Sequence, residues 1–299
     1  METIDTTTAR VAEARQQVLR EVGEAEIKFV RLWFTDLVGR LKSFAITRDE
    51  LASALDHGMG FDGSSVTGFN AIEESDMIAM PDPATFRMMP PESGEHASAR
   101  MFCDIRTPDG EPYEADSRQV LRSALDRMAG LGFDSFKIGP ELEFFLFRMD
   151  EQGRPHTLDA GGYFEDTTMD AAVNLRKEIV LALEEMGIPV EYLHHEVGPS
   201  QHEIDIRYAD ALQMADHCMT YRSLVKEVAQ RHGLHATFMP KPLFGENGSG
   251  MHTHQSLFTG GKNAFYDPDD EFFLSDTAKA FIAGQLRHAR ELSALFAPS

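Results

Sequence analysis

The chain has little of what marks secreted, disulfide-stapled or membrane-spanning proteins. Its two cysteines, Cys103 and Cys218, are far apart in the sequence and fit neither a CxxC pair nor a disulfide framework. Its unbroken apolar runs are about as long as Ile179–Leu183, whereas a membrane-spanning helix needs roughly 20 apolar residues. The first twenty residues are polar and amphipathic and contain no apolar leader segment. We therefore expect a cytoplasmic protein without a membrane partner.

Positive charge is also scarce. Lys and Arg number 28 against 49 Asp and Glu, which gives a formal net charge of −21 over 299 residues. A surface this negative repels phosphate backbones and anionic lipids, so we expect no nucleic-acid partner. The charge does not exclude ATP, because a nucleotide can enter a locally positive, metal-loaded cleft. Since 42% of the residues are apolar, the chain can bury a large core, and we expect two domains.

Hydrophobic periodicity predicts an α+β protein in two parts. We expect an N-terminal helical segment over 1–24, a small domain over 25–112 and a larger domain, mainly antiparallel, over 113–299. Helices are predicted over 11–23, 49–57, 116–130, 166–186, 209–232 and 275–297. Strands are predicted over 27–34, 41–46, 99–104, 136–147, 190–197, 201–208, 236–240 and 250–258, with a hairpin turn at 36–39. Residues 58–91 have little periodicity and are predicted to form a long loop, which in a compact domain is usually functional or disordered.

Glutamates recur on the predicted strands of the larger domain. Glu141 and Glu143 share one face of the apolar segment GPELEFFLF. Glu196 stands at the end of another strand, in YLHHEV, with His194 on the same face. A single pair of this kind is also typical of a strand end whose acids reach solvent.

A third strand segment, QHEIDIR, adds Glu203 in a mostly apolar setting. Its alternation places Glu203, Asp205 and Arg207 opposite two isoleucines. We interpret Asp205 and Arg207 as a surface ion pair, and Glu203 as a further member of the glutamate set.

Several carboxylates buried together need compensating cations, because an uncompensated buried charge costs several kcal/mol or neutralises itself. Four glutamates and one histidine form an oxygen-rich site that suits Mg²⁺ or Mn²⁺ rather than zinc. Two such ions flanking a phosphoryl group would make the cluster useful in phosphoryl transfer. The sequence has no GxxxxGK[ST] and no GxGxxG, so a nucleotide would bind without a P-loop or Rossmann loop.

Two other classes of protein stay open on these residues alone. A metal-dependent hydrolase could use the histidine pairs His194–His195 and His252–His254, although no HExxH helix occurs and carboxylates outnumber these histidines. A catalytically silent binding or regulatory protein predicts a broken set of acids, and the set is intact as far as the chain goes.

The segment KPLFGENGSGMHTHQS, residues 241–256, combines a glycine-bracketed loop with two histidines and a serine. The loop over 247–250 can adopt backbone angles closed to other residues and bring N–H groups close to a small ligand. If the next residues form a strand, the period of two places His252, His254 and Ser256 on one side.

Together these segments resemble the glutamine synthetase family. KPLFGENGSGMHTHQS is similar to the family's ATP-site signature, and FDGSS, EESDM, GPELEFF, GGYF, HHEVGPSQHE and TFMPKP resemble its other blocks in the same order. The likeness runs from residue 25 to the end and is closest to the class I, bacterial and archaeal type. It implies a β-grasp-like domain followed by a catalytic domain built on a half-barrel of antiparallel strands with helices. It also implies ATP-dependent ligation of ammonia to the γ-carboxylate of glutamate through γ-glutamyl phosphate, giving glutamine.

The resemblance implies a role for each matching residue. One divalent metal would be held by Glu143, Glu196 and Glu203, and a second by Glu141 and His252. The ATP site would be lined by Glu191, His254, Gln255 and Ser256. Glutamate would be received by Asn247 and Gly248. The ammonium site would be formed by Asp62, Tyr163 and Glu196.

The resemblance further implies a dodecamer of two hexameric rings in which Asp62 reaches the site of a neighbouring subunit. Ser200 stands where a glycine is common in the family, a change that we expect to be harmless. Because the family's chain continues past residue 299, we expect an incomplete catalytic domain and no turnover by these 299 residues alone. Two alternatives remain within the family. The protein could ligate polyamines or other amines to glutamate, or it could be a catalytically silent truncated homologue.

Overall fold

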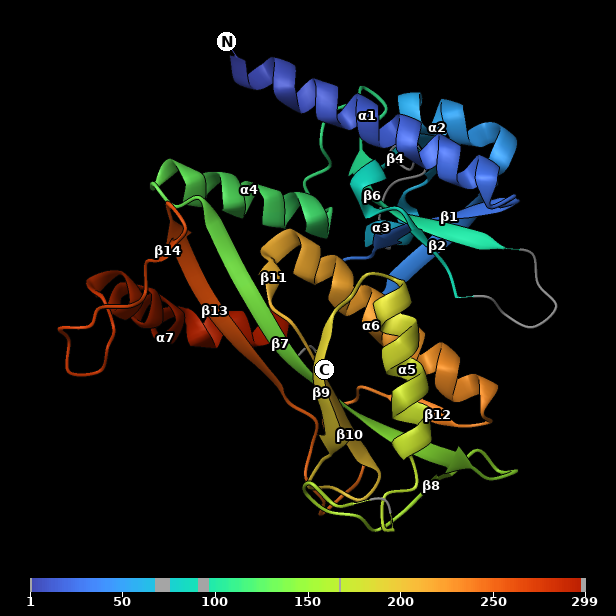
Figure 1. The fold of residues 1–299 in the computed structure, drawn as a ribbon, viewed down its shortest axis with the longest axis vertical. Helices are drawn as coiled ribbons and strands as arrows, with labels where there is room; N and C mark the ends of the chain where they lie inside the picture. Colours follow the sequence, from blue (N-terminus) through green and yellow to red (C-terminus); the bar gives the residue numbers. More distant parts are fainter. Residues whose placement is uncertain (1, 68–75, 91–96, 167, 297–299) are drawn as a thin grey trace.

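The computed structural model describes residues 2–67, 76–90, 97–166 and 168–296. These residues form two sheets, each with its own buried apolar core and its own helices (Figure 1). The smaller sheet belongs to the N-terminal part of the chain and the larger sheet to the rest. No helix among the described residues has both the length and the apolar character needed to cross a bilayer.

The N-terminal sheet has six strands in the order β2-β1-β6-β4-β3, with β5 paired to β6. Their bounds are Phe29–Thr35 for β1, Leu41–Thr47 for β2, Met59–Asp62 for β3, Asp76–Pro81 for β4, Arg87–Met88 for β5 and Ser98–Arg106 for β6. β1 and β6 run parallel, and the other pairs are antiparallel. The hairpin between β1 and β2 was predicted correctly: the Asp36 carboxylate accepts hydrogen bonds from the amides of Val38 and Arg40, and Gly39 has a φ of 74°.

Helices cover this sheet on its outer side (Figure 1). They are α1, Glu2–Glu24, and α2, Leu51–His57. This part of the chain also has three short helical segments: η1, Arg48–Glu50, α3, Ser64–Thr67, and η3, Pro83–Thr85. α1 starts earlier than the predicted helix over 11–23 and buries Val18 and Val22 in the same core as Leu32 and Met101. Burial of this apolar face, more than local propensity, stabilises the helix.

The long loop predicted over 58–91 is wrong in part, because β3, β4 and β5 lie within it. These strands are short, and they are held by pairing with each other and with β6, which follows later in the chain. Such pairing is decided by distant partners rather than by local alternation. The first three residues of EESDM, 73–75, lie outside the described residues.

The larger sheet has eight strands, and all of its pairings are antiparallel. Its order is β14-β13-β7-β10-β9, with β8, β11 and β12 also paired to the long strand β7. The bounds are Ser135–Met149 for β7, Pro155–Thr157 for β8, Val190–His195 for β9, Gln201–Ile206 for β10, Ala209–Asp210 for β11, His235–Thr237 for β12, Met251–Thr259 for β13 and Lys262–Asn263 for β14. The strand predicted over 236–240 is therefore shorter than expected and ends before Pro240, which has no N–H to donate to a ladder.

Four helices accompany this sheet: α4, Ser117–Gly130; α5, Val173–Glu185; α6, Ala211–Arg231; and α7, Asp276–Phe296. The predicted N-cap at Asp116 is confirmed, since its carboxylate accepts a hydrogen bond from the Arg118 amide. The helix predicted to begin at 166 begins at Val173 instead. The preceding residues form turns in which the Asp170 carboxylate accepts from the Ala172 amide.

α5 and α6 pack on one face of the larger sheet (Figure 1). The side chains of Leu142, Phe144 and Ile204 point to these helices and are 3% exposed or less. Because side chains alternate along a strand, the residues between them point to the other face. That other face of β7 and β10 carries the glutamates.

Candidate active site

The antiparallel pairing of β7 brings together acidic residues that are far apart in the sequence. In the register, Glu143 lies opposite Glu203 of β10, and Glu141 lies opposite both Asp205 of β10 and His252 of β13. Directly opposed residues share a face, with Cβ atoms about 5 Å apart. The sheet therefore gathers the charged side chains of three strands in one place.

The most enclosed group consists of Glu143, Glu196, Glu203 and His194. His194 Nε2 lies 3.1 Å from a Glu203 carboxylate oxygen, and its Nδ1 lies 3.7 Å from a Glu196 oxygen. Glu196 and Glu203 are 9% and 6% exposed, so their charges are largely withdrawn from water. The other Glu196 oxygen accepts a hydrogen bond from the Val197 amide at 2.9 Å.

Burial and mutual repulsion raise the pKa values of two of these carboxyl groups. Burial, with repulsion from Glu203 and Glu143, raises the pKa of Glu196 to about 7. Burial also raises the pKa of Glu143, and the nearby Glu203 adds to this effect. For His194, burial opposes charging, but the Glu203 carboxylate outweighs it and the pKa is raised. A cluster of buried acids with raised pKa values fits a divalent cation, which would remove the repulsion and take oxygen ligands.

A second, more open group surrounds Glu141. Its two carboxylate oxygens lie 3.2 Å from His252 Nδ1 and 2.6 Å from His254 Nε2. Both histidine side chains are largely exposed, at 79% and 75%. Although partial burial opposes it, the two histidines lower the pKa of Glu141. His254, expected to line a nucleotide site, thus also contacts the residue expected to hold a metal.

The interpretation of Asp205 and Arg207 as a surface ion pair is wrong. Asp205 is 4% exposed, and Arg207 is exposed and makes no ion pair with it. Burial raises the pKa of Asp205 to about 6. Asp205 instead lies with His194 and Glu203, and one potential ligand atom from each of the three falls within 4.8 Å of the others. The error arose because alternation shows which residues share a face but not whether that face is covered.

The loop over 241–250 lies against Glu143. The Gln201 side-chain amide donates to a Glu143 oxygen at 2.7 Å and to the Gly248 carbonyl at 3.0 Å, so it joins the strand to the loop. Glycine is required at 248 by close packing: an added Cβ would lie 2.3 Å from the Pro240 carbonyl oxygen. The expected left-handed backbone is absent at Gly248 and Gly250; within the described loop it occurs at Gly245. Asn247 is exposed beside them.

Two adjoining cavities, of about 230 and 220 Å³, lie next to Glu141. Glu191 lines the first cavity, Gln255 and Ser256 line the second, and His254 lines both. Tyr208 also lines both and packs against Gly139, where an added Cβ would lie 3.3 Å from the Tyr208 Cβ. The residues that sequence reasoning missed here are Lys137, Tyr208 and Asn263.

Tyr163 and Asp62 differ in their relation to the acidic cluster. The Tyr163 ring packs edge-on against His194 with ring centroids 5.5 Å apart. Burial and the nearby Glu196 raise the pKa of the Tyr163 hydroxyl. Asp62 lies at the end of β3 in the N-terminal sheet, and its carboxylate accepts a hydrogen bond from the Ser64 amide at 2.9 Å. No hydrogen bond or ion pair of the described residues joins Asp62 to the cluster.

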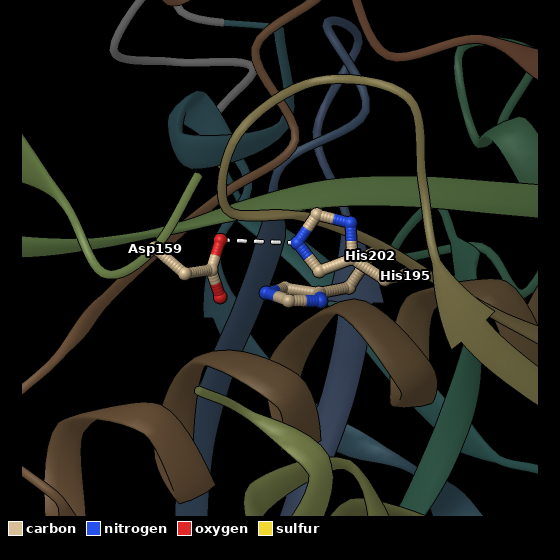
Figure 2. A group of neighbouring side chains, drawn as sticks. All are labelled: Asp159, His195 and His202. Atoms are coloured by element: carbon tan, nitrogen blue, oxygen red, sulfur yellow. Dashed lines mark hydrogen bonds and ion pairs between the residues drawn. The ribbon is translucent and has the colours of Figure 1, made fainter. Parts of the chain in front are cut away.

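A buried group behind the cluster was missed by sequence reasoning (Figure 2). Asp159 faces the His195 ring, with Oδ1 to Nε2 at 3.0 Å, and the His202 ring lies edge-on to that of His195. These three side chains could be taken for a metal site. However, Arg176 donates to His202 Nδ1 at 2.8 Å, so Nε2 carries the proton and is not a ligand. We interpret the group as support for the segment that carries Glu196.

Ser200 belongs to this support. Its φ of 62° is unfavourable for a residue with a side chain. Its buried hydroxyl accepts hydrogen bonds from the amides of Leu158 and Asp159, at 2.6 and 3.2 Å, and its own amide donates to Asp159. These bonds offset the strain, so a serine is tolerated in this left-handed position.

The chain is similar to known proteins in both sequence and fold. The chain matches the family model "Glutamine synthetase, beta-Grasp domain" over residues 26–108 and "Glutamine synthetase, catalytic domain" over residues 114–299. It is 54% identical to a glutamine synthetase of Mycolicibacterium smegmatis and 49% identical to one of Methanosarcina mazei, covering 94% and 95% of this chain. A cryo-EM structure of Plasmodium falciparum glutamine synthetase superposes with a TM-score of 0.84 at 29% identity, covering 94% of this chain and 61% of that one. A GmaS–ADP complex also gives 0.84, at 32% identity, covering 92% of this chain and 64% of that one.

The fold and site thus define an α+β protein with a β-grasp domain and a catalytic domain on an antiparallel sheet. The chain belongs to the glutamine synthetase family. It spans 64% of the length of the curated relatives from M. smegmatis and M. mazei. The predicted fold class is confirmed.

Proposed function

We propose that this protein is a glutamate–ammonia ligase of the cytoplasm. It would use ATP to form γ-glutamyl phosphate and let ammonia displace phosphate, giving glutamine. The observation that carries the proposal is the enclosed cluster of Glu143, Glu196 and Glu203 with His194, on the sheet of a glutamine synthetase catalytic domain. Catalysis of phosphoryl transfer depends mostly on positioning the reactants and neutralising their charge. A cluster of this kind, with metal ions bound, would do both.

The residues present fit two divalent metals, Mg²⁺ or Mn²⁺. Glu143, Glu196 and Glu203 would hold one ion, and Glu141 and His252 the other. Bound there, the ions would neutralise the phosphate oxygens of ATP and of the acyl phosphate. In this chain the Gln201 amide fixes the direction of the Glu143 carboxylate, and His194 fixes that of Glu203.

The two cavities beside Glu141 support a nucleotide site. Glu191, His254, Gln255 and Ser256 would contact ATP from the β9 and β13 sides. Asn247 and Gly248 would receive the backbone groups of glutamate, in a loop that Gln201 holds close to the metal cluster. With the nucleotide and the amino acid bound in these positions, the γ-phosphate of ATP would point toward the γ-carboxylate of glutamate.

The ammonium site would be formed by Asp62, Tyr163 and Glu196. Tyr163 and Glu196 lie around His194, and the exposed Asp62 carboxylate is free of the cluster of its own chain. A homo-oligomer in which a neighbour supplies Asp62 would complete the site, and we propose a dodecamer of two hexameric rings. A carboxylate there favours ammonium over water and can accept its proton.

Metal-dependent ATP binding tests the proposal on this chain. Calorimetry should detect ATP binding with Mn²⁺ and none in EDTA. Glu196→Gln keeps an acceptor for the Val197 amide but removes a charge, so it should weaken ATP binding at least about tenfold. Glu185→Gln, an exposed change on α5, should have no effect. An ATP affinity that is the same with Mn²⁺ and in EDTA, and the same in Glu196→Gln as in the parent chain, would overturn the proposed site.

The amine acceptor needs its own measurement. On the assembled enzyme, γ-glutamyl product formation with ammonium should exceed that with putrescine, spermine or ethanolamine. A preference for one of these amines would change the function to γ-glutamyl-amine ligation while leaving the metal and ATP sites intact.

A further inference from the structure

A cleft of about 400 Å³ lies between the β1–β2 hairpin and α6, away from the residues of the proposed reaction. Four cationic side chains line it. Arg31 comes from β1, Arg40 from the residue before β2, and Arg222 and Lys226 from α6. The hairpin belongs to the N-terminal domain and α6 to the catalytic domain, so the cleft joins the two.

None of these four side chains makes an ion pair with a carboxylate among the residues that the structure describes. Two buried arginines elsewhere in the chain behave differently. Arg118 is surrounded by three aspartates, and Arg176 is paired with Asp170. Two of the four cations are instead placed by packing: Arg222 and Lys226 lie over the Phe238 ring at 5.6 and 5.9 Å.

Arg222 and Lys226 are also four residues apart on one helix, a spacing at which like charges repel. Burial, with the Arg222 charge adding to it, lowers the pKa of the Lys226 ammonium. One acid, Glu227, lines the same cleft, and it accepts a hydrogen bond from Ser223 at 3.1 Å. The cleft therefore carries a surplus of positive charge.

That surplus is notable in a chain with a net charge of −21. Across most of the surface a free anion is repelled, so one cationic cleft would concentrate anions locally. Guanidinium forks match the oxygens of phosphate, and 400 Å³ is within the range of small-molecule sites.

We propose that this cleft binds a small phosphate-bearing anion, which links the β1–β2 hairpin to α6. The anion satisfies cations from both domains at once, so its binding stabilises their association. The proposal does not depend on the ligase activity, because none of the four residues belongs to the metal, ATP or glutamate sites.

Thermal unfolding and calorimetry with inorganic phosphate and pyrophosphate test this site. The measurements are made in EDTA, so that the acidic cluster holds no metal, and against NaCl at matched ionic strength. Both anions should bind and raise the Tm of the parent chain. The double variant R222Q/K226Q should bind at least about tenfold more weakly, because two charge-assisted contacts are lost.

The matched control is R287Q/K262Q, which removes the same two charges from exposed positions on α7 and β14. It should bind like the parent chain. If R222Q/K226Q fails to fold, Arg40→Gln, at an exposed position in the hairpin, removes a cation without touching the core. Equal binding by parent and cleft variants, or no binding by the parent, would refute the site. Binding of citrate but not of either phosphate would overturn the assignment to a phosphate group.

Discussion

At the scale of single residues, the acids of the site are arranged for binding at the expense of stability. Glu196 and Glu203 are buried side by side, with the pKa of Glu196 raised to about 7, although nothing in the fold requires charge there. Natural proteins accept such local cost where function needs it. The same arrangement gives a test that separates a metal site from a merely structural group.

Replacing Glu203 by Gln should abolish stabilisation by Mn²⁺. In the parent chain, Mn²⁺ at about 100 times its Kd should raise the free energy of unfolding by about 2.7 kcal/mol. In E203Q this gain should vanish, while stability in EDTA should be no lower, since a repelling charge is gone and His194 keeps an acceptor. Differential scanning calorimetry with and without Mn²⁺ measures both.

Glu184→Gln on the exposed side of α5 is the control and should keep the full Mn²⁺ response. An unchanged response in E203Q would show that the cluster is an ordinary group of acids.

His217 should make the protein sensitive to moderate acid. Burial, with the nearby charges of Arg100 and Arg87, lowers the pKa of His217 to about 4 from an ordinary value of 6.5. Between these two values the unfolded chain binds a proton that the folded chain does not. The contribution of His217 to the free energy of unfolding should therefore be fully present above pH 6.5 and fall by about 1.4 kcal/mol per pH unit down to about pH 4. Glu196 and Asp205, whose pKa values are raised, contribute in the opposite direction over this range, so the effect of His217 is the difference in slope between the parent and the variant.

Urea unfolding from pH 7.5 to 4.5 measures this slope. His217→Gln should lower stability at neutral pH but flatten the slope, whereas the exposed His232→Gln should keep it. A slope that is the same in all three proteins would assign the acid sensitivity to other groups.

At the scale of elements, the Gly248 end of the loop between β12 and β13 is held by contacts rather than by a left-handed backbone. Gly248 packs its Cα against the Pro240 carbonyl, and its own carbonyl accepts from Gln201. A methyl group at 248 would have to push this part of the loop away from Pro240 and would so disturb the bond from Gln201 to the Gly248 carbonyl. The strand-borne glutamates would stay in place, because their positions depend on β7 and β10.

Gly248→Ala should therefore weaken glutamate and ATP binding by at least about tenfold while lowering the free energy of unfolding by only about 1–2 kcal/mol. Mn²⁺ stabilisation should be largely retained. Gly130→Ala, at the end of α4 where an added Cβ meets nothing within 4 Å, is the control. Binding unchanged by Gly248→Ala would remove the loop from the site.

At the scale of the whole molecule, sequence reasoning succeeded where local pattern decides structure. Glu141 and Glu143 could be placed on one face of β7 because alternation is a property of a single strand. The burial of Asp205 could not be found this way, since it depends on which strands flank β10 and what covers them. The strands within 58–91 were missed for the same reason. The family resemblance supplied the rest of the site, and it placed Asp62 apart from the cluster of its own chain.

The least predictable feature is the junction between the domains. Arg118, at the start of α4, contacts Asp104 of β6, Asp82 beside η3 and Asp216 of α6, at 2.9, 2.8 and 2.6 Å. Its side chain is 6% exposed. No sequence pattern links Arg118 with its three partners, because the four residues come from four separate segments. One guanidinium thus holds together residues of both domains, and its removal leaves three aspartates without their common cation.

Arg118→Ala should lower the free energy of unfolding by about 3–5 kcal/mol, the usual cost of breaking a buried ion pair by removing one partner. It should also uncouple the two domains. Trp33, the single tryptophan, is a buried residue of β1 that lines the cleft between the N-terminal sheet and α6, so its fluorescence follows the separation of the two domains, while far-UV circular dichroism follows the unfolding of both. The two urea transitions should coincide in the parent chain and separate in the variant.

Arg122→Ala is the control, because Arg122 contacts Asp82 and Asp104 but is 36% exposed. This change should lower the free energy of unfolding by about 1 kcal/mol or less. If both variants lose the same small stability and unfold in one step, the domains are held by apolar contact and not by Arg118.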